Sequence, residues 1–255
     1  MSISNQAAPA WDQVSDGQLG LTQGIHQESS TQLYPLGHRV ALNDGRVYHY
    51  AENGAGTLAP GKLVGSPLLF TEIERSITVA AAVNATTVTY TAAGPITANQ
   101  YQDGFLCVVG NTGEGIQYKI KSHPAITAAA TGVITLYDGI ITALDVTSDV
   151  LLTPSLYKDV ILSPNQVIKT VGVPTMPVPA EYFCWVQTWG QCLVLCGASD
   201  GDAATERWCV PALATGEFKS TAGGIVGTET IGYQMGESQD VVIAEHYPIY
   251  LTIAP

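Results

Sequence analysis

The chain has 255 residues, of which 46% are hydrophobic and 13% are charged, and its formal net charge at pH 7 is −12. The charged fraction is about half of the usual 25%, and the mean hydropathy is +0.17, which excludes an intrinsically disordered protein. The acidic balance and scattered basic residues exclude a protein that binds nucleic acid through clustered lysine and arginine. Such sparing use of charge favours an assembly subunit over a free monomeric enzyme.

The sequence predicts neither a targeting segment nor a membrane span. Residues 1–11 (MSISNQAAPAW) contain neither the basic region nor the apolar stretch of a signal peptide. The uncharged stretch Tyr182–Ser199 contains polar residues within an alternating pattern, which predicts strands and not an apolar helix. We therefore expect a protein that is made and folded in a cytoplasm and has no membrane partner.

The first 36 residues are predicted to form an extended N-terminal arm. They are rich in Gln, Ser and Gly, and no period of 2 or 3.6 persists among them. Such an arm is either disordered or ordered by lying on a neighbouring chain, and isolated apolar residues favour the neighbour over packing within the same chain. The residues that we expect to anchor the arm on a partner are Trp11, Leu21, Ile25 and Tyr34.

A β-hairpin follows the arm. Val40 and Leu42 precede the turn sequence Asn43-Asp44-Gly45, and an apolar, aromatic run follows it. His49 lies between two tyrosines and so on the opposite strand face, which predicts an exposed imidazole. The hairpin residues that we expect to contact a partner are Arg39, Arg46, Tyr48 and Tyr50, with packing inside their own subunit as an equal alternative.

Short strands separated by turn signals account for the rest of the chain, and no window shows a convincing helical stripe. The predicted strands lie within 77–90 and at 105–109, 116–120, 132–136, 150–152, 160–162, 167–171, 182–188, 191–196, 207–210, 231–235, 241–243 and 249–253. This spacing predicts an all-β fold with two sandwich-like or barrel-like regions after the arm and hairpin.

A proline-dense stretch, residues 172–179 (GVPTMPVP), is the predicted domain boundary because three prolines in six residues favour an extended link. The expected organisation is therefore an arm at 1–36, a β-rich domain with the hairpin at 37–172, and a C-terminal β domain at 173–255.

The cysteines show no CxxC pair, and their odd number in a chain made in the cytoplasm favours free, buried thiols. Cys192 and Cys196 share a parity that places them on one face of a strand. Whether Cys184, Cys192, Cys196 and Cys209 pair or bind metal stays open, as does calcium binding by the turn carboxylates at 199–202.

No catalytic motif is visible. The histidines form no HExxH motif, no GxSxG elbow is present, and residues 110–115 (GNTGEG) are typical of a hairpin loop and not of a phosphate loop. Phe183 and Trp185 share a strand face, which favours a core or subunit interface over a sugar-stacking platform. We expect a non-enzymatic protein without a cofactor.

Three segments resemble virion structural proteins of tailed bacteriophages, particularly the capsid decoration (cement) proteins of aquatic phages. These segments are 36–50 continuing to 58–63, 96–120 running into 134–145, and 182–190 with the terminal strands of 231–251. The resemblance implies a β-rich homotrimer that binds the outer face of the capsid and clamps neighbouring capsomers. It also implies that the partner is the major capsid protein lattice and that no catalytic residue is present.

The expected function is therefore stabilisation of a phage head by a protein on its outer surface. A tail or fibre adhesin that binds host surface glycans is the alternative, because it shares the β composition and aromatic pairs. If the arm anchors the protein, deletion of residues 1–36 should leave a folded chain that no longer binds capsids.

Overall fold

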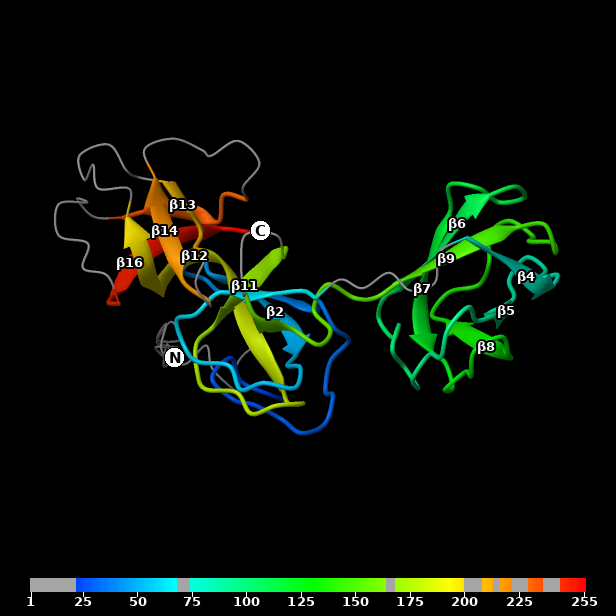
Figure 1. Ribbon diagram of the computed structural model, residues 1–255, viewed down its shortest axis with the longest axis horizontal. Coiled ribbons are helices and arrows are strands. Elements are labelled where there is room, and N and C mark those ends of the chain that lie inside the picture. The colour runs from blue at the N-terminus through cyan, green and yellow to red at the C-terminus, as the bar shows by residue number, and fades with distance from the viewer. Residues whose placement is uncertain are drawn as a thin grey trace, which may run out of the picture. The chain divides into compact units, whose positions relative to one another are not determined.

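The computed structural model describes residues 22–67, 74–163, 168–199, 208–212, 216–221, 229–235 and 244–255. Within these ranges the regular structure consists of strands, which confirms the all-β prediction. The chain forms two compact units (Figure 1). We call Met1–Pro67 with Tyr157–Pro255 the discontinuous unit, and Leu68–Leu156 the inserted unit.

The inserted unit is a closed antiparallel barrel in which the strands follow the order β4-β5-β8-β7-β6-β9. Its strands are β4 (Arg75–Val79), β5 (Thr87–Thr91), β6 (Phe105–Gly110), β7 (Gln117–Ser122), β8 (Thr131–Leu136) and β9 (Asp149–Thr153). Alternate residues such as Val150 and Leu152 are fully buried and fill the interior. Residues 110–115 join the paired strands β6 and β7, which confirms the predicted hairpin loop.

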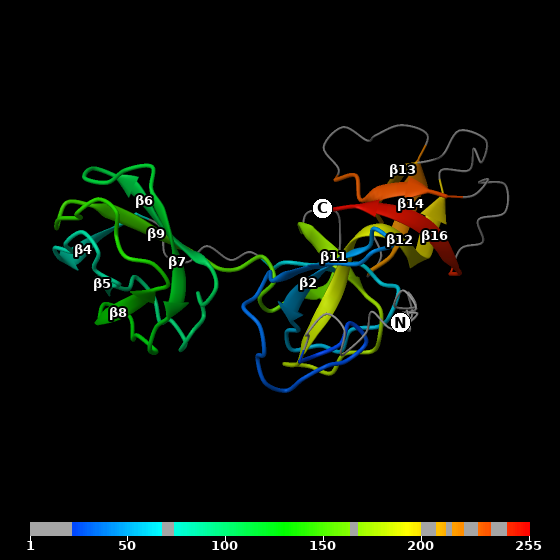
Figure 2. The same ribbon diagram turned by 180° about the vertical axis from the view of Figure 1, so that it is seen from behind.

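The discontinuous unit contains the other strands. They are β1 (Arg39–Ala41), β2 (Val47–Glu52), β3 (Val64–Gly65), β10 (Ile161–Leu162), β11 (Thr170–Pro174), β12 (Phe183–Ser199), β13 (Trp208–Pro211), β14 (Phe218–Thr221), β15 (Gly232–Gln234) and β16 (His246–Thr252). Strands β12, β14, β13, β15 and β16 close into a five-stranded mixed barrel, since β16 also pairs with β12 (Figure 2). The pair β12–β14 is parallel, and the other pairs of this barrel are antiparallel.

Strand β12 joins two regions of the discontinuous unit. Its first half pairs with β2, from Phe183 opposite Glu52 onward, and its second half pairs with β16 as far as Leu195 opposite His246. The sequence predicted two strands here, whereas one strand runs through. Gly190 allows this because its φ of +87° changes the strand's direction without ending it, a conformation that strongly favours glycine.

The domain boundary predicted at residues 172–179 is wrong. β11 pairs with β3 and with β12, and Val178 forms a bridge with Leu58, so this proline-dense stretch lies inside the discontinuous unit. The chain divides after Pro67 and after Leu156 instead. Because β3 and β10 are paired neighbours, the chain leaves for the inserted unit and returns from it at adjacent positions.

The described part of the arm, residues 22–36, packs on its own chain. The backbones of Ser29 and Phe183 exchange hydrogen bonds of 3.0 and 2.8 Å, and Ile25 is 3% exposed. The prediction that these residues lie on a neighbouring chain is therefore wrong, because β2 and β12 already provide the apolar surface that covers Ile25. Trp11 and Leu21 lie outside the described residues.

Candidate functional site

The turn between β1 and β2 holds the side chain of Arg46 in a fixed position. Gly45 adopts a φ of +89°, as a tight hairpin turn requires. The Asp44 carboxylate accepts a 3.0 Å hydrogen bond from the Arg46 backbone amide and a 2.7 Å charge-assisted bond from Arg46 Nε. The same carboxylate therefore closes the turn and orients the guanidinium group.

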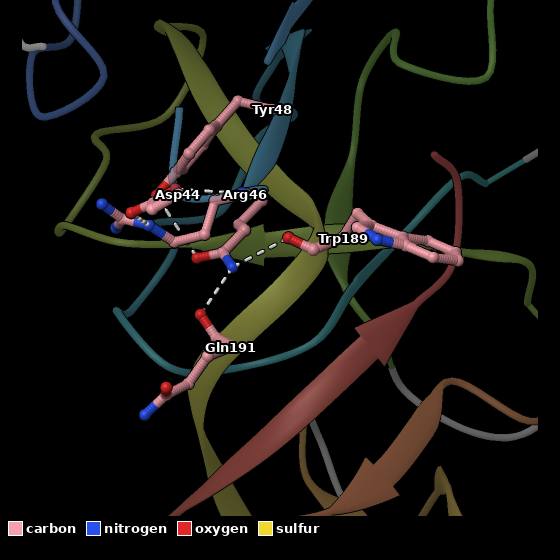
Figure 3. A network of polar contacts seen from close by, with 6 residues as sticks. Asp44, Arg46, Tyr48, Trp189 and Gln191 are labelled. Atoms are coloured by element: carbon pink, nitrogen blue, oxygen red, sulfur yellow. Dashed lines mark hydrogen bonds and ion pairs between the residues drawn. The ribbon is translucent and has the colours of Figure 1, made fainter. Parts of the chain in front are cut away.

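A chain of hydrogen bonds connects this arginine to β12 (Figure 3). Arg46 Nη1 donates to the Tyr48 hydroxyl at 3.0 Å, and this hydroxyl donates to Gln187 Oε1 at 3.3 Å. Gln187 Nε2 donates in turn to the carbonyl oxygens of Trp189 and Gln191 at 3.1 and 2.8 Å. Because Tyr48 and Gln187 are buried and their polar groups are paired, the network holds Arg46 in one geometry.

The Tyr48 hydroxyl is a structural group in this network. Burial is the main cause that raises its pKa to about 12, although the Arg46 charge acts in the opposite direction. The phenol is therefore protonated at neutral pH, when it can donate to Gln187 but cannot act as a base.

A pocket with a volume of about 680 Å³ lies beside this network. Its walls come from the hairpin turn, the loop at 60–61, the end of β11 with the residue after it, β12 and the first residue of β16. The lining residues are Asp44, Arg46, Pro60, Gly61, Pro174, Thr175, Gln187, Gln191, Cys192, Leu193 and His246. An open pocket of this size, with apolar walls and a few fixed polar groups, is typical of small-molecule sites.

A second surface feature lies on the inserted unit. The pairing of β4 with β9 continues past the strand ends, because Ala81 bridges Leu144 in the same register. Exposed aliphatic side chains lie along this ladder, and we call them the apolar edge. They are Val79 (56% exposed), Val83 (50%), Ile141 (70%) and Val146 (56%). In this register Val79 is opposite Val146.

The structure contradicts partner contacts for two of the predicted hairpin residues. Tyr48 and Tyr50 are both 0% exposed, because they pack in one core cluster with apolar residues of the N-terminal segment such as Ile25 and Leu36. His49 is also buried, where its ring stacks on Tyr157 with 5.0 Å between centroids. The predicted exposed imidazole is therefore wrong. Burial is the main cause that lowers the His49 pKa to about 4, and the Arg39 charge adds to it.

The other predicted contact residues differ in how exposed their side chains are. Arg39 is exposed, and its Nε donates to the carbonyl oxygen of Pro255 at 3.0 Å, whereas Arg46 lines the pocket. Ile25 is buried, so it is not available to a partner. Tyr34 is half-buried and packs against Tyr50 with 5.3 Å between ring centroids.

The described cysteines are free thiols. Cys192 and Cys196 are buried in the same core cluster, which confirms that they share a strand face. Burial raises the pKa of both Cys184 and Cys192 to about 12, and it also raises that of Cys209. Among the described residues, no group of three or more His, Cys, Asp or Glu is placed to hold a metal ion.

Comparisons with protein-family models, curated proteins and solved structures found no match. Across the part of the chain that the structure describes, no helix is both long and apolar enough to span a membrane. Sequence reasoning identified Arg46 but missed both the pocket and the apolar edge. Val79 and Val83 belong to the alternating run at 77–90, which is visible in the sequence. The sequence does not show that the segment 140–146 lies beside that run.

Proposed function

We propose that this chain is a non-enzymatic structural protein of a phage virion, a decoration protein that binds the outer capsid surface and stabilises the head by clamping neighbouring capsomers. The observation that supports this proposal best is the apolar edge. It presents four aliphatic side chains, each at least half exposed, in a chain with only 13% charged residues. Exposed apolar groups that gather in one place are typical of protein–protein contact surfaces.

The energetics favour a lattice partner. Full burial of one aliphatic side chain contributes about 1.5–3 kcal/mol, much of which is spent on ordering the two partners. A single small contact is therefore weak. A capsid offers the same contact many times, and a homotrimer that engages several copies at once gains avidity without any new contact. Binding to the mature lattice alone stabilises that lattice by mass action.

Four of the residues predicted to contact a partner are still proposed as capsid contacts. Arg39 and Arg46 are accessible at the surface of the discontinuous unit, and Trp11 and Leu21 belong to the segment outside the described residues. The buried residues Ile25, Tyr48 and Tyr50 leave the proposal, because their side chains stabilise the discontinuous unit itself.

The test is cosedimentation of the purified chain with undecorated phage capsids, together with its mass in solution by light scattering. We expect saturable binding and a trimeric mass. The variant Ile141→Thr with Val146→Thr keeps β-branched side chains but removes apolar surface, so it should weaken binding about tenfold or more. Leu33→Ser is the matched control, because Leu33 is an exposed aliphatic residue of the other unit.

Three results would contradict the proposal in different ways. Absence of capsid binding by the unaltered chain would exclude the decoration function. Equal binding by the double variant and the control would exclude the apolar edge as the contact. A monomeric mass with saturable binding would exclude the trimer alone.

A further inference from the structure

We propose that the pocket beside Arg46 is a binding site for an uncharged carbohydrate, a function that goes beyond capsid binding. The pocket lies entirely within the discontinuous unit, and the apolar edge lies within the inserted unit. The pocket and the apolar edge therefore belong to different units, so substitutions in one of them can be tested without changing the other.

The charge of the pocket favours a neutral ligand. Among the described lining residues, the carboxylate of Asp44 and the guanidinium group of Arg46 form an ion pair across 2.7 Å. A free anion would meet the Asp44 carboxylate and the acidic chain as a whole, which has a net charge of −12. A free cation would meet the guanidinium group at the same place. Neither sign of charge therefore gains from entering.

The hydrogen-bonding groups match a ligand that both donates and accepts. Arg46 uses Nε and Nη1 within the network, which leaves its Nη2 as a donor. The side-chain amide of Gln191 points away from the network (Figure 3), and it makes no hydrogen bond to another described residue. This amide offers one acceptor and two donors. Sugar hydroxyls, which also donate and accept, satisfy such a mixed set.

The apolar walls match the carbon faces of sugar rings. Pro60, Pro174 and Leu193 line the pocket without polar side-chain atoms. His246 packs directly over Gly61, since an added Cβ on that glycine would lie 2.5 Å from the His246 ring. Of the described lining residues, His246 supplies an aromatic ring, and none is Tyr, Trp or Phe.

The fixed geometry of Arg46 reduces the entropic cost of binding. Its guanidinium group is held by Asp44 and Tyr48, and Tyr48 is held by the buried Gln187. A ligand therefore does not need to order this long side chain, which normally loses considerable rotamer freedom when it binds. The network of Figure 3 thus prepares the site before the ligand arrives.

The test uses an array of neutral and acidic bacterial surface oligosaccharides, followed by calorimetric titration of the full chain with the best-retained saccharide. We expect retention of at least one neutral oligosaccharide. Gln191→Ala and His246→Ala remove exposed lining side chains that take no part in the network, to which Gln191 contributes only its backbone carbonyl. Each substitution should weaken binding about tenfold. Gln117→Ala removes a matched exposed strand glutamine from the inserted unit and should leave the affinity unchanged.

Capsid cosedimentation of the same variants separates this proposal from the decoration function, because Gln191→Ala should still bind capsids fully. Retention of no saccharide by the unaltered chain would overturn the carbohydrate site, and retention of acidic saccharides alone would overturn its neutral class. Equal affinities of the unaltered chain and both pocket variants would exclude this pocket as the binding site.

Discussion

The Tyr50 hydroxyl donates a 2.6 Å hydrogen bond to the side-chain oxygen of Gln23, a residue in the segment predicted to be an extended arm on a neighbouring chain. The amide nitrogen of Gln23 donates to the backbone oxygen of Phe183 at 3.0 Å, and the Trp185 indole donates to the Gln23 backbone oxygen at 3.0 Å. One buried glutamine thus connects the N-terminal segment, the hairpin and β12. Deletion of residues 1–36 would remove part of this core as well as any capsid contact.

The Gln23–Tyr50 pair predicts a measurable coupling in the free energy of unfolding. Gln23→Ala leaves the Tyr50 hydroxyl buried without its acceptor, which should destabilise the chain by about 1–3 kcal/mol. Tyr50→Phe should lower the loss caused by Gln23→Ala, because the unpaired hydroxyl is then absent. A double-mutant cycle by urea denaturation should give a coupling of about 1 kcal/mol. Strictly additive losses would show that the bond contributes nothing to stability.

Gly190→Ala should destabilise the discontinuous unit. The φ of +87° at Gly190 costs about 1–2 kcal/mol for a residue with a Cβ, and that Cβ would lie only 3.1 Å from Arg46 Cα. Gly56→Ala is the matched control, because a Cβ on Gly56 would have no atom within 4 Å. Thermal unfolding should show a lower midpoint for the first variant and an unchanged or slightly raised one for the second. Similar midpoints would argue against strain at Gly190.

Stability should decrease on acidification because of His49. The His49 pKa is about 4 in the folded protein, against 6.5 for an unperturbed histidine such as that of the unfolded chain. Above pH 6.5 both states hold a neutral ring, so His49 contributes no pH dependence there. Between pH 6.5 and 4 the unfolded chain binds a proton that the folded chain does not, which should lower the free energy of unfolding by about 2 kcal/mol at pH 5.

The measurement for His49 is denaturant unfolding of the unaltered chain and of His49→Gln at pH 7 and pH 5. The variant should lose less stability between the two pH values. Burial is the main cause that raises the pKa of Glu52, so protonation of Glu52 adds stability as the pH falls and opposes the effect of His49. Both the unaltered chain and His49→Gln contain Glu52, so its contribution cancels when their pH dependences are compared. His26→Gln changes an exposed histidine and serves as control. Equal pH dependence in all three proteins would contradict the role of His49.

The thiols should react with Ellman's reagent in two distinct phases. Cys107 is half-buried, whereas Cys184, Cys192, Cys196 and Cys209 are buried. A rise in pKa from 9 to about 12, as at Cys184 and Cys192, lowers the thiolate fraction near neutral pH about a thousandfold. We expect at most one thiol to react in the folded protein and the others only after unfolding.

The substitution Cys107→Ser identifies the thiol that reacts first. It should abolish the early phase and leave the later phase unchanged. Persistence of the early phase in this variant, or rapid reaction of several thiols in the folded chain, would show that the core around Cys192 opens readily.

Local patterns in the sequence were sufficient for the fold class and for the position of the hairpin. Alternation at β6, β8 and β9 predicted their buried faces, because each of these strands is covered on one side by the barrel interior. The Asn43-Asp44-Gly45 turn was predictable because its conformation depends on the residues of the turn itself.

The same reasoning failed where a strand is covered on both faces. Tyr48, His49 and Tyr50 alternate in sequence yet are all buried, because the two tyrosines pack in a core cluster while His49 stacks on Tyr157. The predicted domain boundary at residues 172–179 was wrong for a related reason. Prolines predicted a linker, but β11 finds strand partners on both sides in β3 and β12.

Residue patterns alone establish an all-β chain of low charge with a tight hairpin near its start. The folded chain is needed to see that Arg46 lines a pocket, that Gln23 is part of a core, and that Val79 lies opposite Val146. A local pattern reports how neighbouring residues alternate along one strand. Burial and site geometry depend on which distant segment lies against that strand, as Gln187 does against Tyr48 across 139 positions.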